Sequence, residues 1–418
     1  MIAVFFFSAI LYYTDRFILN LLVDPIRAEL HINDTQVSLL QGVAFAVVYA
    51  LAGLPFGRFA DVLPRRGVIM AGVVTWSAAT VACGFAHSFG QLFAARVAVG
   101  IGEAALAPAA VSMIADYFPP QRRGAAIGVF LTGMAIGGGM AIVAGGGLLQ
   151  AANAGLFRRL PLMAGLAPWR EVLVLLGLPA VVILALLLTI QEPARHGRAA
   201  SGAALPLKDV VRGFASRAPV LLPLYLAVAL ASAGDFSLQN WTPALLSRRF
   251  HMGPGEIGST LGAIAIAVGV VGSIFGGVLS DRLARRGGPR ARLKASLTAA
   301  LIGLGGAGIA LAGSGYQAMG FFTLWLLMAS FSETIGITLV QELVPNEMRG
   351  VGASLVSLFN MLIGLGLGTS LTAVFTDHVY RNPQAVGWSI TSVMAPAGVL
   401  SVLLFWRALT ALKRHGPA

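Results

Sequence analysis

Long apolar segments recur along the whole chain and are separated by short polar ones. A segment of about 18 or more apolar residues is long enough to cross a bilayer as a helix. The pattern predicts spans at residues 2–24, 35–57, 68–87, 91–117, 124–150, 169–191, 218–246, 255–280, 293–314, 317–343, 350–376 and 386–407. We therefore expect an all-α membrane protein with twelve transmembrane helices.

The polar segment that follows the second predicted span reappears in the second half of the chain. Gly57-Arg58-Phe59-Ala60-Asp61 and Arg65-Arg66-Gly67 return as Gly277-Val278-Leu279-Ser280-Asp281 and Arg285-Arg286-Gly287 at a constant offset. Pro119…Arg123-Gly124 likewise returns as Pro345…Arg349-Gly350. Same-sense repeats in the same order indicate a duplicated transporter. We expect two pseudo-two-fold-related six-helix bundles, at 1–191 and 218–418, joined by a cytoplasmic linker at 192–217.

Composition and charge support a membrane protein. Hydrophobic residues make up 57% of the chain and charged residues 11%, and the mean hydropathy is +0.82. The 29 Lys and Arg residues fall mainly in loops on the side of both termini. The positive-inside rule then predicts a multi-pass protein of the inner membrane with both termini in the cytoplasm. The net charge of +12 lies in short loops, so it favours membrane lipids as partners and argues against nucleic acid.

Several kinds of chemistry find no support in the sequence. Cys83 is the only cysteine, which excludes an internal disulfide or a cysteine metal site, and the six histidines lack metal-ligand spacing. There is no phosphate-binding loop for ATP and no recognisable nucleophile–base set. Gly100-Ile101-Gly102-Glu103-Ala104-Ala105 mimics a dinucleotide fingerprint, but it lies inside a predicted span. We therefore expect neither an enzyme nor a cofactor or a metal site.

Ionisable residues at bilayer depth are costly, so each is a functional candidate. Tyr12, Asp15, Arg16 and Asn20 form one polar stripe on the first span, and Arg96 and Glu103 share a face of the fourth. The four charges sum to zero. Protonation of Asp15 or Glu103 would leave an arginine uncompensated, which suggests a proton-coupling network. The alternative is a permanent salt-bridge cluster that fixes the two helices.

The second half offers polar groups without a basic residue at matching depth. Ser232, Asp235, Gln239 and Thr242 fall on one helical face, with Asn240 and Trp241 beside it, and Glu333 and Asn360 lie on later spans. We interpret Asp235, Gln239, Asn240, Trp241, Glu333 and Asn360, together with Tyr12 and Asn20, as the lining of a substrate cavity.

The repeated loops suggest a cytoplasmic gate. Asp61 can accept hydrogen bonds from the free N–H groups of the helix that begins at Arg349-Gly350, and Asp281 from the helix at Arg123-Gly124. Gly57, Arg65, Arg66 and Arg285 complete the predicted gate. The alternative is a turn that only sets the topology.

Two resemblances follow from these motifs. Gly57-x-x-x-Asp61-x-x-x-Arg65-Arg66 resembles the signature of the major facilitator superfamily between helices 2 and 3, although Val62-Leu63-Pro64 replaces its usual Arg and Gly. Tyr13-Thr14-Asp15-Arg16, with Arg96 and Gly100-x-Gly102-Glu103-Ala104, resembles the spinster family of lipid transporters. These resemblances imply two bundles rocking about a central cavity, proton coupling at the acids, and sphingosine-1-phosphate or lysophospholipid substrates.

We expect a monomeric, proton-coupled transporter that moves an amphiphilic lipid or a related organic anion by alternating access. Its partners would be that small substrate, protons and membrane lipids. A symporter for a soluble organic acid and a drug/proton antiporter are the alternatives within the same class. A receptor or scaffold without transport activity is the alternative outside it.

Overall fold

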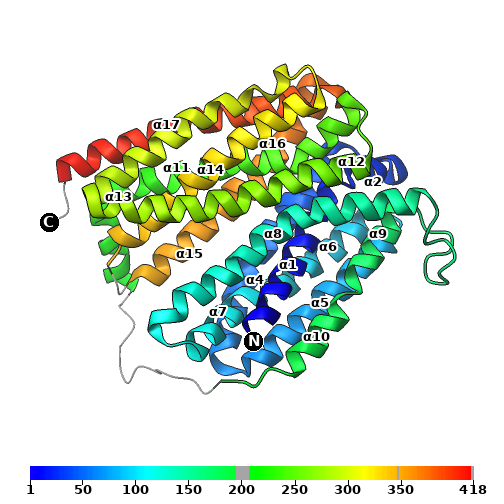
Figure 1. Ribbon diagram of the computed structural model, residues 1–418, viewed down its shortest axis with the longest axis horizontal. Coiled ribbons are helices and arrows are strands. Elements are labelled where there is room, and N and C mark those ends of the chain that lie inside the picture. The colour runs from blue at the N-terminus through cyan, green and yellow to red at the C-terminus, as the bar shows by residue number, and fades with distance from the viewer. Residues whose placement is uncertain (194–206, 346–347, 416–418) are drawn as a thin grey trace. The chain divides into compact units, whose positions relative to one another are not determined.

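The computed structural model describes residues 1–193, 207–345 and 348–415. A few side chains within these ranges, including those of Asp61 and Arg349, are outside the description. The described chain is all helical (Figure 1). Eleven of its helices are long and apolar enough to cross a membrane. The all-α prediction is thus confirmed.

The difference between eleven helices and twelve predicted spans has one local cause. The candidate span Pro254–Leu311 has 58 residues and contains both predicted spans 255–280 and 293–314. At Gly288, φ is 58° and ψ is −151°, and Pro289 follows. Glycine tolerates a positive φ, and proline interrupts helical hydrogen bonding. The chain therefore breaks between two membrane-crossing segments.

Contacts divide the chain into two compact units. Unit 1 comprises Met1–Arg198 and Leu246–Ile266, and unit 2 comprises Ala199–Leu245 and Ala267–Ala418. The segment Leu246–Ile266 follows the predicted linker in sequence, yet it clusters with unit 1.

The first half of the chain forms these elements: α1 (Ile2–Phe17), the 3₁₀ turn η1 (Ile18–Asn20), α2 (Val23–Leu30), α3 (Asp34–Ser38), the π-helix η2 (Leu39–Val43), α4 (Ala44–Val62), α5 (Arg65–Gly84), α6 (Phe89–Glu103), α7 (Leu106–Tyr117), α8 (Pro120–Asn153), α9 (Pro168–Gly177) and α10 (Ala180–Leu188).

The second half forms these elements: α11 (Leu207–Phe250), α12 (Pro254–Ile257), the π-helix η3 (Gly258–Gly262), α13 (Ala263–Gly303), η4 (Leu304–Leu311), α14 (Gly315–Leu343), α15 (Arg349–Phe359), the π-helix η6 (Asn360–Gly368), α16 (Thr369–Val374), η7 (Phe375–Tyr380), η8 (Pro383–Ala385) and α17 (Val386–His415).

Local backbone features repeat between the halves. His31 and His251 both adopt a left-handed conformation, with φ of 51° and 52°. Ser88 and Ser314 each cap a helix, accepting a hydrogen bond from the backbone N–H of Gln91 and Gln317 respectively. A polar side chain at this position satisfies a free N–H group at the helix start. The duplication therefore extends to helix ends.

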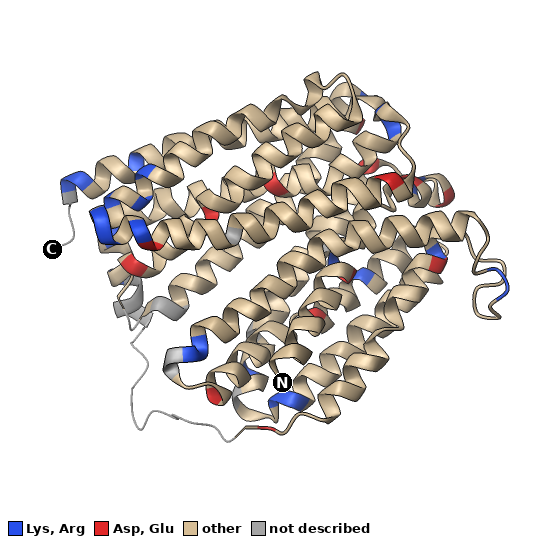
Figure 2. Ribbon diagram, in the orientation of Figure 1, with Lys and Arg blue, Asp and Glu red and all other residues tan. Residues whose placement is uncertain are grey.

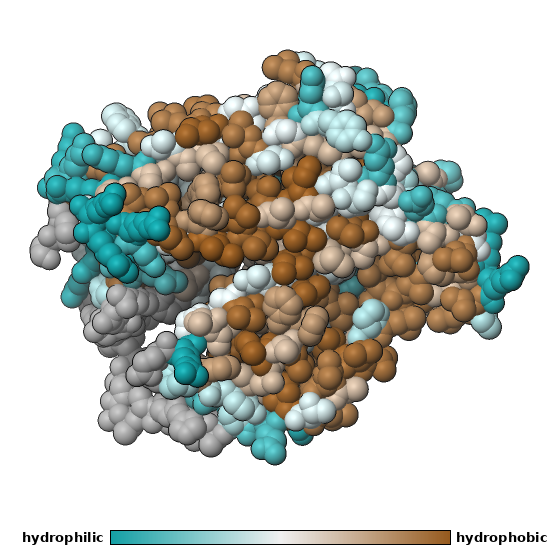
Figure 3. Space-filling model, viewed as in Figure 1, coloured by the Kyte–Doolittle hydropathy of each residue, from teal (hydrophilic) through white to brown (hydrophobic). Residues whose placement is uncertain are grey.

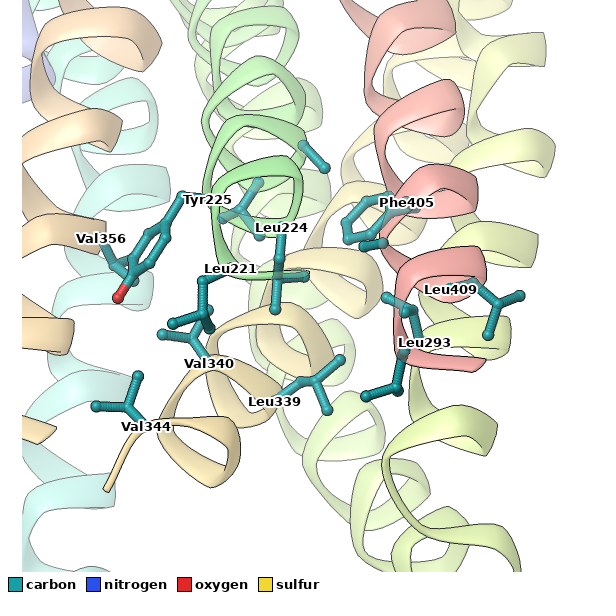
Figure 4. Close-up of a cluster of buried hydrophobic side chains, with 14 of the residues drawn as sticks. Leu221, Leu224, Tyr225, Leu293, Leu339, Val340, Val344, Val356, Phe405 and Leu409 are labelled. Atoms are coloured by element: carbon teal, nitrogen blue, oxygen red, sulfur yellow. The ribbon is translucent and has the colours of Figure 1, made fainter. Parts of the chain in front are cut away.

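Each unit has its own apolar interior. In unit 1, α1 packs along α8, where a Cβ added at Gly137 would lie only 2.5 Å from the carbonyl oxygen of Ile10. Small residues at four-residue spacing permit such close approach. The lone Cys83 of α5 is also buried there. In unit 2, a buried cluster joins α11, α13, α14, α15 and α17, with Leu224 and Phe405 fully enclosed (Figure 4).

Candidate functional site

The guanidinium of Arg16 lies in an aromatic enclosure near the end of α1. Its central carbon is 4.4 Å from the ring centroid of Tyr12 and 4.9 Å from that of Tyr13. From the next span, Phe45 and Tyr49 approach to 4.4 and 4.8 Å. Aromatic faces attract cations, and the attraction grows when water is excluded. Arg16 is therefore held in place, with only 4% of its surface exposed.

Glu103, at the end of α6, is the anionic partner of Arg16. Its Oε2 accepts a hydrogen bond from Nε of Arg16 at 3.0 Å, and Nη2 of Arg16 lies 3.0 Å from the same oxygen. Glu103 has no exposed surface. Removing one partner of such a buried pair leaves an uncompensated charge, so the pair is energetically coupled.

Arg96, from the same helix as Glu103, has different partners. Its guanidinium donates to the backbone oxygens of Leu40, Asp15 and Arg16, at 3.4, 3.4 and 3.2 Å. Carbonyls at the end of a helix lack intrahelical donors and carry partial negative charge. Arg96 therefore supplies hydrogen-bond donors to the backbone carbonyls at the junction between α1 and the tighter turn η1.

Asp15 is fully buried, and no donor comes within hydrogen-bonding geometry of either carboxyl oxygen in the described structure. Thr80 and Trp76 of α5 are the polar groups that face it. The indole N–H of Trp76 also has no hydrogen-bond partner within the described residues. Sequence reasoning missed both residues, because single polar groups in an apolar helix are common. An isolated carboxylate in such surroundings is strongly disfavoured relative to the neutral acid.

The other predicted residues of the first stripe lie beside this network. The Tyr12 hydroxyl accepts a hydrogen bond from Arg16 and donates to the hydroxyl of Tyr49 at 3.0 Å. Asn20 accepts from the side chain of Gln41 at 3.2 Å. The structure thus brings Tyr12, Arg16 and Glu103 together, whereas Asn20 lies with Gln41.

In unit 2, two acids lie among polar neighbours. Gln239 donates to Asp235 at 2.6 Å, and the Ser232 hydroxyl donates to Glu333 at 2.8 Å. No arginine or lysine forms an ion pair with either acid in the described part of the chain.

The remaining predicted cavity residues of unit 2 divide into two kinds. Asn240 and Trp241 are buried and donate to the hydroxyl and the backbone oxygen of Thr369, at 2.7 and 3.0 Å. They hold α11 against α16. Asn360 begins the π-helix η6, and its side-chain oxygen has no hydrogen-bond partner among the described residues.

At the repeated loops, one arginine in each unit is buried against an acid of the same unit. Arg65 pairs with Asp116 and, at 2.9 Å, with Glu192. Arg292 pairs with Glu342 and lies 3.7 Å from Asp281. The sequence repeat aligned Arg65 with Arg285, but the arginine that is buried against an acid in unit 2 is Arg292. The acids that pair with these arginines are Asp116 and Glu192 in unit 1 and Glu342 in unit 2. Because they lie far from the loops in sequence, the loop motif alone does not show which arginine is buried.

The other predicted gate residues remain at the surface or outside the description. Arg66 donates its backbone N–H to Glu192 at 2.8 Å. Asp281 has 73% of its side chain exposed, and Arg285 is exposed. A Cβ added at Gly57 would meet no described atom within 4 Å. The side chain of Asp61 lies outside the described residues, so its latch is untested.

A second buried ion-pair network was not anticipated from the sequence. Arg248, near the end of α11, donates to both oxygens of Asp34 at 2.7 and 2.8 Å and to Asp24 at 2.7 Å. Arg27 lies 3.0 Å from Asp34, which has no exposed side-chain surface. We call these four residues the Arg248 clasp. It joins α2 and α3 to the segment Leu246–Ile266 within unit 1.

Glu192 shows how these pairs tune protonation outside the spans. Burial opposes its ionisation, but the backbone N–H of Arg66 and the side chain of Arg65 donate to it and hold its pKa below the usual value. Among the described residues, no group of three or more His, Cys, Asp or Glu side chains could hold a metal ion.

Comparisons with known proteins place the chain in a family. Residues 5–369 match the model of the Major Facilitator Superfamily. The chain is 29% identical over 415 residues to an MFS-type efflux pump of Mycolicibacterium smegmatis, covering 96% of this chain and 90% of that protein. It is 26% identical over 298 residues to Protein spinster of Drosophila melanogaster, covering 68% of this chain and 46% of that protein.

A solved structure agrees with these relatives. It is a bacterial homologue of the human lysosomal transporter Spinster, in an inward-facing and unoccupied conformation. The TM-score is 0.79 at 26% identity, covering 99% of this chain and 96% of that one. The resemblances stated from the motifs are therefore confirmed. The chain is a spinster-like transporter of the Major Facilitator Superfamily, and not an enzyme.

Proposed function

We propose that the protein is a proton-coupled transporter that moves an amphiphilic lipid or a related organic anion across the inner membrane by alternating access. The observation that carries the proposal is the contrast between the two acids of unit 1. Glu103 pairs with Arg16 through its Oε2 oxygen, whereas neither carboxyl oxygen of Asp15 has a hydrogen-bond partner in the described structure. We assign Asp15 as the acid that carries the proton in this conformation.

Loss of that proton would change the forces on Arg96. The new carboxylate at Asp15 attracts this guanidinium, which now donates to backbone oxygens at the end of α1. Drawing Arg96 away would leave those carbonyls without a donor and loosen the junction between α1 and η1. Proton release at Asp15 is thereby linked to a change in helix geometry.

Protonation of Glu103 has a different consequence. It would release Arg16 from its ion pair and make the guanidinium available to an anionic group of the substrate. The aromatic rings around Arg16 would then lose their cation. Arg16 and Arg96 are therefore counter-charges of the proton sites and also candidate ligands for an anionic head.

The substrate cavity is proposed to use both kinds of interior. Unit 1 would supply charge through Arg16, with Tyr12 and Asn20 beside it. Unit 2 would supply hydrogen-bonding groups through Asp235, Gln239, Glu333 and Asn360, with Asn240 and Trp241 positioning α11. The charge supplied by unit 1 matches the ionic head of an amphiphilic lipid and would equally match an organic anion.

Two gates are proposed to alternate. On the cytoplasmic side, Asp61 and Asp281 would latch helix starts of the opposite half, as predicted, with Gly57, Arg65, Arg66 and Arg285 in the same loops. On the outer side, the Arg248 clasp would hold the end of α11 against α2 and α3. This orientation keeps both termini in the cytoplasm.

The decisive experiment is uptake into proteoliposomes with an imposed proton gradient. Asp15→Asn and Glu103→Gln should each lose gradient-driven accumulation, while equilibrative exchange of substrate persists. Glu256→Gln, which changes an exposed acid, serves as the matched control and should accumulate substrate as the parent does. Concentrative uptake by Asp15→Asn against a gradient would refute the assignment.

The efflux pump and an organic-acid transporter among the relatives define the second candidate function. The chain shares 35% identity over 132 residues with a probable L-galactonate transporter of Escherichia coli, covering 32% of this chain. Thermal stabilisation separates the cases, since a bound ligand raises the unfolding temperature. A lysolipid should stabilise the purified protein and a short-chain acid should not; the reverse would favour a soluble organic acid.

A further inference from the structure

One end of unit 2 carries a cluster of exposed cationic side chains on two helices. Four belong to α13 and flank its break at Gly288, and two belong to the end of α17. We call the six the basic rim: Arg285, Arg286, Arg290, Lys294, Arg407 and Lys413. In Figure 2, the blue ribbon positions that mark Lys and Arg gather at this end of α13 and α17.

The two helices meet in the buried cluster beneath the rim. Leu293 of α13 belongs to the same apolar cluster as Leu409 and Leu412 of α17, and Figure 4 shows Leu293 beside Leu409. Arg290 and Lys294 flank the first of these leucines. The rim is therefore one surface, although its parts are far apart in the sequence.

The rim is not neutralised within the described structure. Both neighbouring acids, Asp281 and Glu342, face the buried Arg292, which is not part of the rim. None of the six rim side chains forms an ion pair with a described carboxylate. The field of several like charges then extends outward from this surface.

Unit 1 treats the corresponding arginines differently. The side chain of Arg65 binds Glu192 and Asp116, whereas the guanidinium of Arg66 donates to the backbone oxygen of Ile190. Unit 1 also exposes Arg58 and Arg122, and neither forms an ion pair with a described carboxylate. What distinguishes the rim is that six such cations gather on two helices that share one apolar cluster.

The exposed apolar residues next to the rim indicate its level relative to the membrane, and hence the kind of partner that it can bind. On α17, Leu400, Leu403 and Trp406 are 49%, 52% and 57% exposed, follow one face, and lead directly to Arg407. On α13, Phe275 and Leu279 lie exposed on the face that continues to Arg286. Figure 3 shows a hydrophilic area at this end bordering a hydrophobic surface. An exposed apolar stripe that ends in tryptophan and arginine is typical of the lipid headgroup level.

We propose that the basic rim binds the phosphate-bearing headgroups of anionic phospholipids in the membrane leaflet on that side. Clusters of Lys and Arg next to a membrane span attract anionic lipid electrostatically. Bound lipid would hold the ends of α13 and α17 together over the shared apolar cluster. The rim is thus a lipid-binding surface separate from the transport site.

The test compares two double variants in the purified full-length protein. The rim variant is Arg290→Gln/Arg407→Gln. The matched control is Arg58→Gln/Arg122→Gln, which removes two exposed arginines from unit 1. Thermal unfolding is measured in neutral micelles and again after addition of phosphatidylglycerol or phosphatidylcholine. Native mass spectrometry counts the lipid that remains bound.

Phosphatidylglycerol should raise the unfolding temperature of the parent and the control, and the rim variant should lose most of that shift and most of the retained lipid. Added salt should reduce the shift. Equal shifts in the two variants, or an equal effect of phosphatidylcholine, would overturn the proposal. Equal protection by inorganic phosphate or by a soluble polyanion would also overturn it, because the partner would then not be a lipid. None of these outcomes depends on the transported substrate.

Discussion

Unit 1 and unit 2 share a repeated framework but fill their interiors with different chemistry. Unit 1 encloses Arg16, paired with Glu103, and a second arginine that satisfies backbone oxygens. Unit 2 encloses Asp235 and Glu333, which have hydrogen-bonding neighbours and no paired arginine among the described residues. Duplication preserved the helix ends and loops, whereas the charges inside each unit diverged. A change of charge should therefore have different consequences in the two interiors.

The largest expected effect is on the paired charges of unit 1. Arg16→Met should destabilise the protein by about 3–5 kcal/mol, because Glu103 is left buried without a counter-charge. Adding Glu103→Gln should recover part of the loss. Thermal unfolding of the two single variants and the double variant gives the coupling free energy. Additive losses would show that the pair does not act as a unit.

The Arg248 clasp should show the next largest effect. Arg248→Gln removes charged hydrogen bonds to Asp24 and Asp34, each worth about 1.5–3 kcal/mol at most. The expected result is a smaller barrier to opening on that side. It can be measured as faster labelling of a cysteine placed near the clasp. Arg249→Gln, at the adjacent position, is the control, and equal labelling rates would contradict the role.

A smaller effect is expected in unit 2. Asp235→Asn leaves no cation unpaired, and an amide can keep a hydrogen bond with Gln239, so stability should change by less than about 1 kcal/mol. Proton-driven accumulation should survive if coupling resides at Asp15. The measurements are the unfolding temperature and the gradient-driven uptake of this variant, each compared with those of Asp15→Asn. Loss of coupling in Asp235→Asn alone would move the proton site to unit 2.

The smallest effect concerns Glu192 at the edge of unit 1. Its folded-state pKa is lowered, so its contribution is present above the unfolded pKa of about 4.3 and is lost as pH falls through the folded value. The group is largely solvent-exposed, so Glu192→Gln should cost no more than about 1 kcal/mol at neutral pH. The difference in unfolding temperature from the parent should shrink on acidification. A constant difference would exclude this ion pair as its origin.

The membrane spans and the all-α fold followed from apolar segment length, because helix formation is the main way to satisfy the backbone in lipid. The run Pro254–Leu311 shows the limit of helix assignment, since only Gly288 and Pro289 separate its two spans. The repeated motif gave the family. It did not identify Arg292 as the arginine that is buried against an acid in unit 2, because that depends on acids in another helix.

The sequence predicted which charged residues form the candidate site, but it predicted only part of how they pair with one another. Spacing placed Arg96 and Glu103 on one face, but Glu103 instead pairs with Arg16. Which arginine reaches an acid depends on side-chain paths between helices, and sequence spacing does not contain that information. The clasp was missed because Asp24, Asp34 and Arg248 lie near span ends, where charges are ordinary. Basic residues are scarce on the predicted outer side, and this scarcity was the one sequence feature that could have singled out Arg248.

Cys83 gives the molecule a practical property. Only 1% of its surface is accessible, and thiol reagents attack a thiolate that meets water. The native chain is therefore almost silent toward maleimide chemistry. A single cysteine introduced at a surface position, with no other substitution, becomes the sole attachment point for a fluorophore or spin label, and a pair of them can report distances while the transporter cycles.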